Sequence, residues 1–418
     1  MSKEVKLQQF EGYEYVEYGA CAPYGFQANG MHTGLHPNPE KNDLGILYSE
    51  MPAETAAVFT TNKVKAAPVL VTADHLKKSH GIASAVIMNC KNANAGTPDG
   101  IEKAERMCEL AAKCLRVNPQ NVLVASTGVI GQILPIEPIE ENISELCRGM
   151  SVDRHLEAEK AVMTTDTVPK EIAVRFSLGE RVCIIGGMAK GRGLIHPNLA
   201  TTLNFITTDC MIAHEVLQKA LDEVVRKTYN CLSVDGDTST NDMVIVMANG
   251  TAGNVTVEEG SKEFEIFKKG LYIVMMNLTR MLATDGEGAT KLLEVSCAGA
   301  PTEECAFTVA KSVVCSNLFK CALFGQDANV GRILCAMGYA DADYDISKAS
   351  IVMASEAGEL TVCENGAITA FSEEIAADIL KEDEIRVEID LHQGEGEGKA
   401  WGCDLTYDYV KINGDYRS

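Results

Sequence analysis

The most unusual stretch of the sequence lies near its middle, where GGMAKGRGLIHPNLA (residues 186–200) runs directly into TTLNFITT (residues 201–208). The first segment contains four glycines and one proline in fifteen residues, a composition typical of a loop. The second segment is rich in β-branched and aromatic residues in near alternation, which predicts a strand. A glycine-rich loop that enters a strand therefore divides the chain into two segments of similar length.

Apolar runs and helical patterns alternate on both sides of this junction, which predicts a mixed α/β protein. Before the junction, helices are expected over residues 100–116 and 153–163, and strands over 85–88, 122–125, 172–178 and 181–185. After it, helices are expected over 212–228, 261–282, 301–316 and 372–381, and strands over 243–247, 291–296, 350–354 and 385–389. Because the sequence has no repeat, low-complexity tract or linker, we expect the junction to lie within one compact body.

Composition and charge exclude several classes of protein. The 418 residues include 37 Lys plus Arg and 59 Asp plus Glu, a net charge of −22 that repels nucleic acids and anionic membranes. The 15 cysteines are dispersed without CxxC pairs, which is typical of a reduced, intracellular protein. The N-terminus has no apolar core like that of a signal peptide, and no 18 apolar residues run together, so a cytoplasmic protein without a membrane span is expected.

The Ala200–Thr201 peptide bond offers a specific chemistry. A threonine hydroxyl at the end of a flexible loop can attack the preceding carbonyl carbon, and hydrolysis of the resulting ester leaves Thr201 with a free α-amine. That amine, with a reference pKa of about 7.7–8, can serve as the base that a threonine nucleophile otherwise lacks. A nearby cation such as Lys190 would lower its pKa further. The alternative is a glycine-rich loop that simply leads into an ordinary strand.

Other motifs indicate less. Asp235, Asp237 and Asp242 have a spacing that suits a hard cation, but a calcium loop would need glycine and glutamate where Thr240 and Val246 stand, so hydrogen-bonded turn acids are expected. The histidines show no zinc-site spacing, and His196 is expected to pack in the loop. Residues 394–399 lack the serine or threonine of a phosphate-binding loop and are expected to form a solvated hairpin turn. No metal or cofactor is therefore expected.

Residues 190–203 resemble the cleavage motif of the ornithine acetyltransferase (glutamate N-acetyltransferase) family, whose pattern is close to KGxGMIxPxMATML. Further blocks agree with the same family in the same order, at residues 25–69, 124–131, 163–170 and 233–242. The resemblance extends from about Gly25 to the last residue. It implies an α/β fold of two stacked β-sheets flanked by helices (αββα), self-processed into an α chain of residues 1–200 and a β chain of residues 201–418 that pair into a heterotetramer.

The resemblance also implies an activity and a set of site residues. The activity is transfer of an acetyl group from N-acetylornithine to glutamate, with release of ornithine; acetyl-CoA is left open as a second donor. Cleavage is implied between Ala200 and Thr201, and the catalytic residues implied are Thr201 as the nucleophile with Thr127 and Gly128 as the oxyanion hole. The substrate-binding residues implied are Thr164, Lys190, Thr201, Glu287, Asn413 and Ser418.

Departures from the family pattern leave room for an altered substrate preference. The family usually has Met at the position of Thr202, Pro and Trp at those of Ala328 and Val330, and often Thr at that of Ser418. Two other classes of protein remain open: a self-cleaving amidohydrolase or aminopeptidase of the related fold, and an uncleaved binding or scaffold protein.

Overall fold

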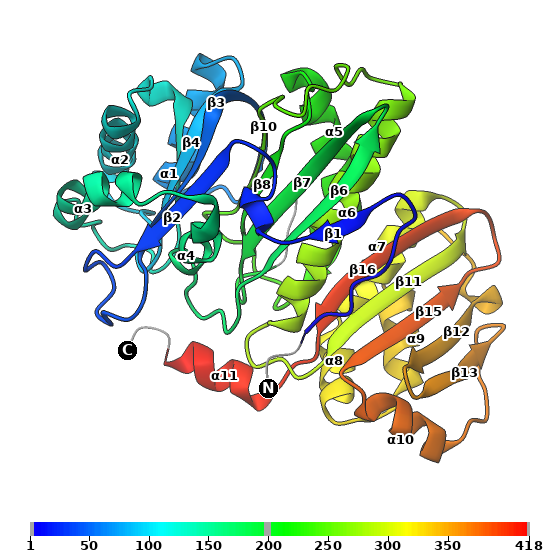
Figure 1. Ribbon diagram of the computed structural model, residues 1–418. Coiled ribbons are helices and arrows are strands. Elements are labelled where there is room, and N and C mark those ends of the chain that lie inside the picture. Colours follow the sequence, from blue (N-terminus) through cyan, green and yellow to red (C-terminus); the bar gives the residue numbers. More distant parts are fainter. Residues whose placement is uncertain (1–3, 196–201, 416–418) are drawn as a thin grey trace.

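The structure, a computed structural model, describes residues 4–195 and 202–415 (Figure 1). Ala200, Thr201, His196 and Ser418 therefore lie outside the described residues. The described chain forms two lobes, each built on one β-sheet with helices packed against it (Figure 1). The prediction of a mixed α/β protein with two sheets is confirmed.

The first sheet contains strands from both sides of the predicted junction in the sequence, and β7 and β8, which flank it, are neighbours in the sheet. Over the described ranges its strand order is β1-β6-β7-β8-β10-β3-β4-β5, and β2 pairs with β3. β8 pairs antiparallel with β7 on one side and parallel with β10 on the other. The strands are β1 (Glu14–Val16), β2 (Phe26–Met31), β3 (Leu44–Phe59), β4 (Ile82–Asn89), β5 (Val122–Ser126), β6 (Glu171–Leu178), β7 (Arg181–Lys190), β8 (Leu203–Thr208) and β10 (Met243–Ala248).

The loop predicted over residues 186–200 was wrong for its first five residues, because β7 continues to Lys190. Gly186 and Gly187 lie inside this strand, where backbone and side chains approach too closely for a larger residue. A Cβ on Gly186 would lie 1.9 Å from the carbonyl oxygen of Gly19, and one on Gly187 would lie 3.2 Å from Leu278 and Val274. The glycines therefore reflect tight packing across the sheet rather than a loop.

Among the described residues, the first lobe contains four helices close to the predicted ranges and two that were not predicted, over residues 67–78 and 137–148. They are α1 (Ala67–Lys78), α2 (Gly100–Leu115), α3 (Glu137–Arg148), α4 (His155–Lys160), α5 (His214–Lys227) and α6 (Lys262–Thr284). The N-cap hydroxyl of Ser261 accepts a hydrogen bond from the backbone N–H of Phe264 and so fixes the start of α6. The helix predicted over 153–163 is shorter, because residues Val152–Arg154 form a 3₁₀ turn and α4 ends at Lys160.

The second sheet comes entirely from residues after the junction. Across the described residues its order is β14-β13-β12-β15-β11-β16-β9, with β9 (Leu232–Ser233), β11 (Leu292–Ala300), β12 (Ser350–Ser355), β13 (Gly358–Glu364), β14 (Ala367–Ile368), β15 (Glu384–Asp390) and β16 (Gly396–Cys403). Its helices and the C-terminal helix are α7 (Glu303–Val314), α8 (Asn317–Phe324), α9 (Val330–Gly338), α10 (Glu373–Lys381) and α11 (Tyr407–Gly414).

Two local predictions in the second lobe are corrected. The helix expected over residues 301–316 begins two residues later, because Thr302 is the N-cap and α7 starts at Glu303. The hairpin turn expected over residues 394–399 is a strand from Gly396 onward, where β16 begins and pairs with β11. A Cβ on Gly398 would lie 2.6 Å from the backbone nitrogen of Phe307 in α7, so this glycine permits a close helix–sheet contact.

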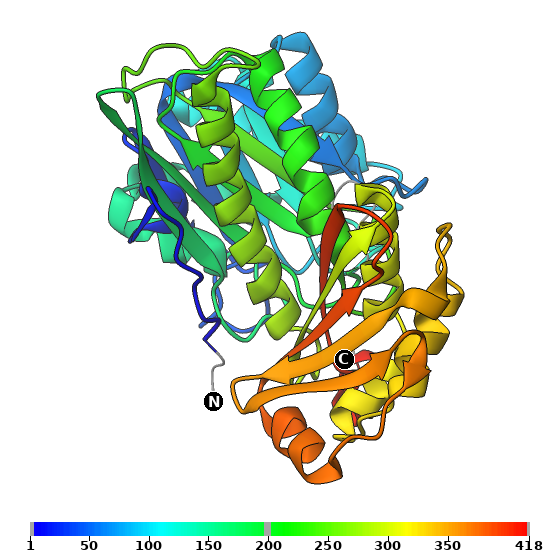
Figure 2. The same cartoon turned by 90° about the vertical axis from the view of Figure 1, so that its right-hand side faces the viewer.

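The two sheets are not directly stacked, which corrects the αββα arrangement. Helix α6 packs on β6 and β7 of the first sheet and also on β11 and β16 of the second, so it lies between the sheets (Figure 2). One hydrophobic cluster runs from Val174 and Ile185 through Leu271 and Val274 of α6 to Trp401 of the second sheet. The strands on either side of the junction, β7 and β8, therefore belong to one sheet within a continuous core.

In the described ranges, no single helix combines the length and apolarity needed to cross a membrane; α7 and α8 pass that test only as a pair bent by 56°.

Candidate active site

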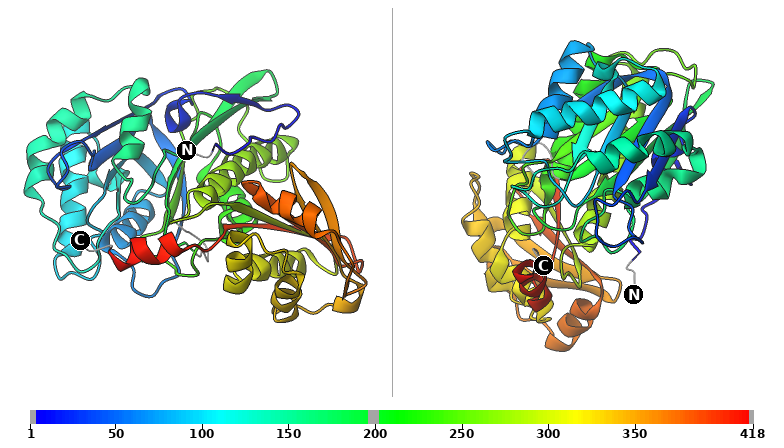
Figure 3. Two further views of the ribbon diagram at one scale, coloured as in Figure 1. Left: turned by 90° about the horizontal axis from the view of Figure 1, so that it is seen from below. Right: turned by 90° about the vertical axis from the view of Figure 1, so that its left-hand side faces the viewer.

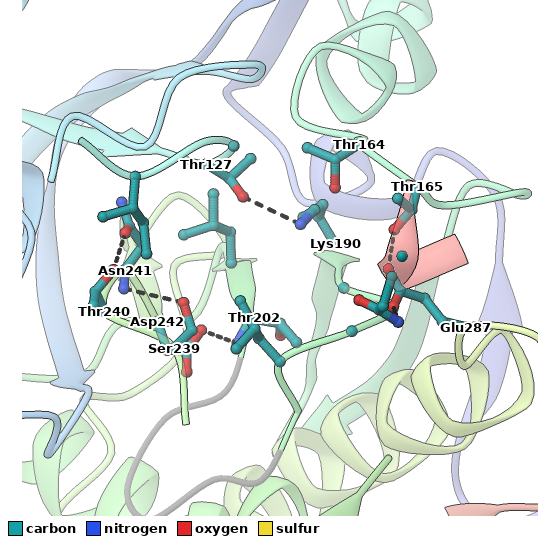
Figure 4. Close-up of a pocket in the computed structure, with 18 residues that line it drawn as sticks. Thr127, Thr164, Thr165, Lys190, Thr202, Ser239, Thr240, Asn241, Asp242 and Glu287 are labelled. Atoms are coloured by element: carbon teal, nitrogen blue, oxygen red, sulfur yellow. Dashed lines mark hydrogen bonds between the residues drawn. The ribbon is translucent and has the colours of Figure 1, made fainter. Parts of the chain in front are cut away.

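A cavity of about 410 Å³ is lined by segments that lie far apart in the sequence. Its size falls within the usual range of small-molecule sites, about 300–1,000 Å³. Among the residues that line it are the six described residues that the sequence placed in the site: Thr127, Gly128, Thr164, Lys190, Glu287 and Asn413 (Figure 4). The structure thus brings these six residues together.

The turn after β5 carries two hydrogen-bond donors that face the cavity residues, the backbone N–H of Gly128 and the hydroxyl of Thr127. The N–H of Thr127 donates to Asn89 O and that of Val129 to Lys91 O, each at 3.0 Å. Between them, the N–H of Gly128 has no partner within the part of the chain that the structure describes. Gly128 has a φ of +135°, and a Cβ there would lie 2.1 Å from the backbone of Lys91, so the turn requires glycine. An unpaired backbone donor beside a hydroxyl is typical of an oxyanion hole.

Lys190 provides the positive charge of the cavity. It ends β7, and its Nζ donates a hydrogen bond to Thr127 Oγ1 at 3.1 Å. An ammonium group can only donate, so Thr127 accepts here and keeps its own proton for another acceptor. Thr127, Thr164 and Lys190 lie together on one side of the cavity (Figure 4).

Glu287 provides a negative charge on another side of the cavity. Its Oε1 accepts from Thr165 Oγ1 at 2.9 Å and its Oε2 from Asn413 Nδ2 at 2.7 Å. Asn413 belongs to α11, which extends from the second lobe to the first (Figure 3). Gly193 allows the approach, because a Cβ there would lie 2.5 Å from Glu287 Oε2. The cavity thus has a cationic and an anionic side.

A buried ion network supports both sides of the cavity. The Nζ of Lys170 lies 2.8 Å from Asp166 Oδ1 and 2.7 Å from Asp285 Oδ2, and its side chain is 1% exposed. Asp166 also accepts the N–H of Gly191 at 2.9 Å, and Asp285 forms an ion pair with Arg192 at 3.4 Å. Burial raises the pKa of Asp166, but Lys170 and Lys190 outweigh it and hold that pKa below its usual range. The network fixes the segments that carry Thr164, Lys190 and Glu287.

Asp242 and Thr202 occupy the start of the central strands. The N–H of Thr202 donates to Asp242 Oδ1 at 2.7 Å, and Thr202 O accepts from the N–H of Met243 at 3.0 Å. Burial raises the pKa of the Asp242 carboxyl to about 7, although the N–H of Thr202 and Lys190 oppose this shift. A residue that sequence reasoning treated as an ordinary turn acid therefore lies in the cavity wall.

Sequence reasoning missed several cavity residues that lie inside blocks it had already singled out. Thr165, Asn241 and Asp242 belong to the segments 163–170 and 233–242, but only Thr164 was assigned a role. The density of polar residues in DGDTSTND (residues 235–242) was the available signal. Of the departures from the family pattern, Thr202 lines the cavity, whereas Ala328 and Val330 are not among its lining residues in the described chain.

The expected turn acids accept hydrogen bonds. Asp235 accepts the backbone N–H groups of Leu194 and Ile195 at 2.8 and 2.9 Å, so it closes the loop beside the cavity. Within residues 4–195 and 202–415, three side chains that could together hold a metal ion are Cys183, Asp209 and Cys210, and they do not line the cavity. Both Asp209 oxygens already accept backbone N–H groups.

The fold defines a mixed α/β protein of two sheets, and its cavity has one cationic and one anionic side. The ArgJ family model matches residues 27–418, and the chain belongs to the ArgJ family. The resemblance to the ornithine acetyltransferase family is thereby confirmed.

Relatives in sequence agree with this assignment, and two solved structures are similar to part of the chain. The chain is 48% identical to the arginine biosynthesis bifunctional protein ArgJ of Caldanaerobacter subterraneus over 95% of this chain and 98% of that protein. The crystal structure of ArgJ from Bacillus halodurans is 46% identical, with a TM-score of 0.48, covering 50% of this chain and 97% of that chain. The structure of ornithine acetyltransferase complexed with ornithine from Mycobacterium tuberculosis is 35% identical, with a TM-score of 0.41, covering 45% and 100%.

Proposed function

We propose that this ArgJ-family acyltransferase of arginine biosynthesis transfers an acetyl group from N-acetylornithine to glutamate through an ester on Thr201. The observation that carries the proposal is one cavity lined by Thr127, Gly128, the cation Lys190 and the carboxylate of Glu287. Lys190 suits the α-carboxylate of an acylated amino acid, and Glu287 suits the distal ammonium group of N-acetylornithine. Thr164, Asn413 and the terminal Ser418 complete the proposed binding set.

Self-cleavage is the proposed first event. The hydroxyl oxygen of Thr201 attacks the carbonyl carbon of Ala200, the C–N bond breaks, an ester C–O bond forms, and the Thr201 nitrogen takes the proton. Water then hydrolyses the ester, which leaves the Ala200 carboxylate and a Thr201 with a free hydroxyl and α-amine. The products are residues 1–200 and 201–418, which we propose pair into a heterotetramer of two copies of each.

Acetyl transfer then follows in two balanced half-reactions. The α-amine of Thr201 takes the hydroxyl proton as the oxygen attacks the acetyl carbon of N-acetylornithine; the amide C–N bond breaks and the proton passes to the leaving amine of ornithine. The α-amine of glutamate next attacks the ester carbon, the ester C–O bond breaks, and the Thr201 oxygen regains a proton. Negative charge develops on the acetyl oxygen both times, so Thr127 and Gly128 act twice.

The experiment that tests this function is incubation of the purified protein with labelled N-acetylornithine and glutamate, followed by measurement of N-acetylglutamate. We expect label in N-acetylglutamate, and a parallel reaction with acetyl-CoA tests the second donor. Release of labelled acetate without N-acetylglutamate would instead establish the amidohydrolase class. An uncleaved chain of 45.0 kDa that transfers nothing would establish the scaffold class.

Replacing Thr127 by valine removes the hydroxyl and keeps the side-chain shape. We expect kcat to fall roughly 100-fold, because one lost oxyanion donor raises the barrier by about 3 kcal/mol. The measurement is steady-state transfer from N-acetylornithine, with the urea midpoint as the control for folding. A normal kcat would remove Thr127 from the oxyanion hole.

Replacing Glu287 by glutamine removes the negative charge and keeps the acceptor oxygen. We expect KM for N-acetylornithine to rise roughly 10- to 100-fold, because a hydrogen bond to a charged group contributes about 1.5–3 kcal/mol. The matched control is Glu294→Gln, since Glu294 is 4% exposed against 5% for Glu287 and lies outside the cavity. Equal KM changes in the two variants would contradict the assignment of Glu287.

A further inference from the structure

Asn241 links the segment just before β10 to the turn at Thr127 and Gly128. Its Nδ2 donates to the carbonyl oxygen of Ser126 at 2.9 Å and to that of Ala93 at 2.6 Å, and the residue is 5% exposed. Its Oδ1 accepts from Thr240 Oγ1 at 2.7 Å, so the amide orientation is determined by its neighbours. Ser126 directly precedes Thr127, and the position of the oxyanion turn therefore depends on this amide.

Asp242, the next residue, binds the backbone at Thr202, which also lines the cavity. Its Oδ1 accepts the N–H of Thr202, which is the peptide nitrogen directly after Thr201, and Asp242 is 3% exposed. The Oγ1 of Thr202 accepts from Asn204 Nδ2 at 2.6 Å, so backbone and side chain of this residue are both fixed.

Thr202 also holds a strained backbone. Its φ is +90°, a conformation that β-branched residues rarely adopt. A Cβ on Gly191 would lie 2.2 Å from Thr202 Cγ2, so the chain also packs tightly against the side chain of this residue. Strain of this kind persists only where surrounding contacts impose it, and the bond to Asp242 is one of them.

We propose that Asn241 and Asp242 are paired positioning residues, which set the distance between the oxyanion turn at Thr127 and the nucleophile at Thr201. Asn241 acts through the carbonyl of Ser126, and Asp242 acts through the peptide N–H of Thr202. Two adjacent residues, directly before the start of β10, thus connect the two halves of the catalytic machinery, which come from opposite sides of the junction. This inference rests on the proposed function, because it needs Thr201 as the nucleophile.

The test compares Asp242→Ala, Asp242→Asn and Asn241→Ala with the wild-type protein. Each is scored for chain cleavage by denaturing electrophoresis and for kcat and KM with N-acetylornithine and glutamate. We expect Asp242→Ala to cleave slowly or to turn over roughly 100-fold more slowly, because a displacement of the order of 1 Å can cost this much. KM should change less than about threefold, since Lys190 and Glu287 are untouched.

Asp242→Asn keeps an acceptor oxygen for the N–H of Thr202 and is expected to restore cleavage and most of kcat. Asn241→Ala should lower kcat at least about tenfold with KM unchanged. Asp209→Ala is the matched control, because Asp209 is 4% exposed and accepts the backbone N–H of Ile184 at 2.8 Å, but lies outside the cavity. It should retain normal cleavage and kcat.

Normal cleavage and kcat in Asp242→Ala would overturn the proposal, as would an Asp242→Asn variant as impaired as Asp242→Ala. A rise in KM without a fall in kcat would also overturn it. Circular dichroism and the Asp209→Ala control identify a variant that has merely unfolded. A wild-type protein that never carries acetyl on Thr201 would instead contradict the proposed function itself.

Discussion

The Thr201→Ala variant is expected to remain a single chain of 45.0 kDa and to transfer no acetyl group. Alanine has no hydroxyl, so neither the ester with Ala200 nor the acetyl ester can form. Without cleavage there is also no free α-amine to act as base. The nucleophile and the free α-amine are both lost with one oxygen atom. We therefore expect this substitution to lower the rate of acetyl transfer more than any other single substitution.

Intact-mass spectrometry and the transfer assay measure this result directly. The control is Thr201→Ser, which keeps the hydroxyl and should retain cleavage and transfer at a reduced rate. A Thr201→Ala protein that separates into two chains and remains active would contradict the assignment of the nucleophile. A wild-type protein that is active as one unbroken chain would contradict self-cleavage.

The Lys170→Met variant is expected to lose about 3–5 kcal/mol of unfolding free energy, because it leaves buried carboxylates without their cation. Lys170 contacts Asp166 and Asp285 at 2.8 and 2.7 Å, and methionine has similar length but no charge. The measurement is urea unfolding at neutral pH. Activity should also fall, since the same carboxylates hold the segments that carry Thr164 and Glu287.

Lys219→Met is the matched control, because Lys219 pairs with Glu259 on the surface, where both side chains are largely exposed. Exposed pairs contribute little to stability, so its urea midpoint should hardly change. If Lys170→Met unfolded at the same urea concentration as Lys219→Met, the network would not stabilise the site.

Local patterns predicted those elements whose apolar periodicity is strong. The helices α2 and α5 and the strands β5 and β10 lie within a few residues of their expected ranges. The strand character of Gly186 and Gly187 could not be read locally, because glycine is typical of loops and the reason for it here is contact with Gly19 and α6. The placement of α6 between the sheets likewise depends on contacts between distant segments.

The site residues came from the resemblance rather than from periodicity. Thr127, Lys190 and Glu287 were assigned by matching blocks, and the structure adds the contacts that bring them into one cavity. The roles of Asn241 and Asp242 remained hidden, because acidic and amide residues in a polar turn are common and only their partners distinguish them. Those partners, Ser126 and Thr202, lie more than a hundred and about forty residues away in the sequence.

The central strand β8 joins the two parts of the chain that the proposed cleavage would separate. Its backbone groups pair with β7, which precedes the junction, and with β10, which follows it. If residues 1–190 and 203–415 were synthesised as separate polypeptides, each would expose an unpaired edge of the same sheet, which invites aggregation. If the chain is cut between Ala200 and Thr201 as proposed, the pairing of β8 with β7 would hold the two resulting polypeptides together.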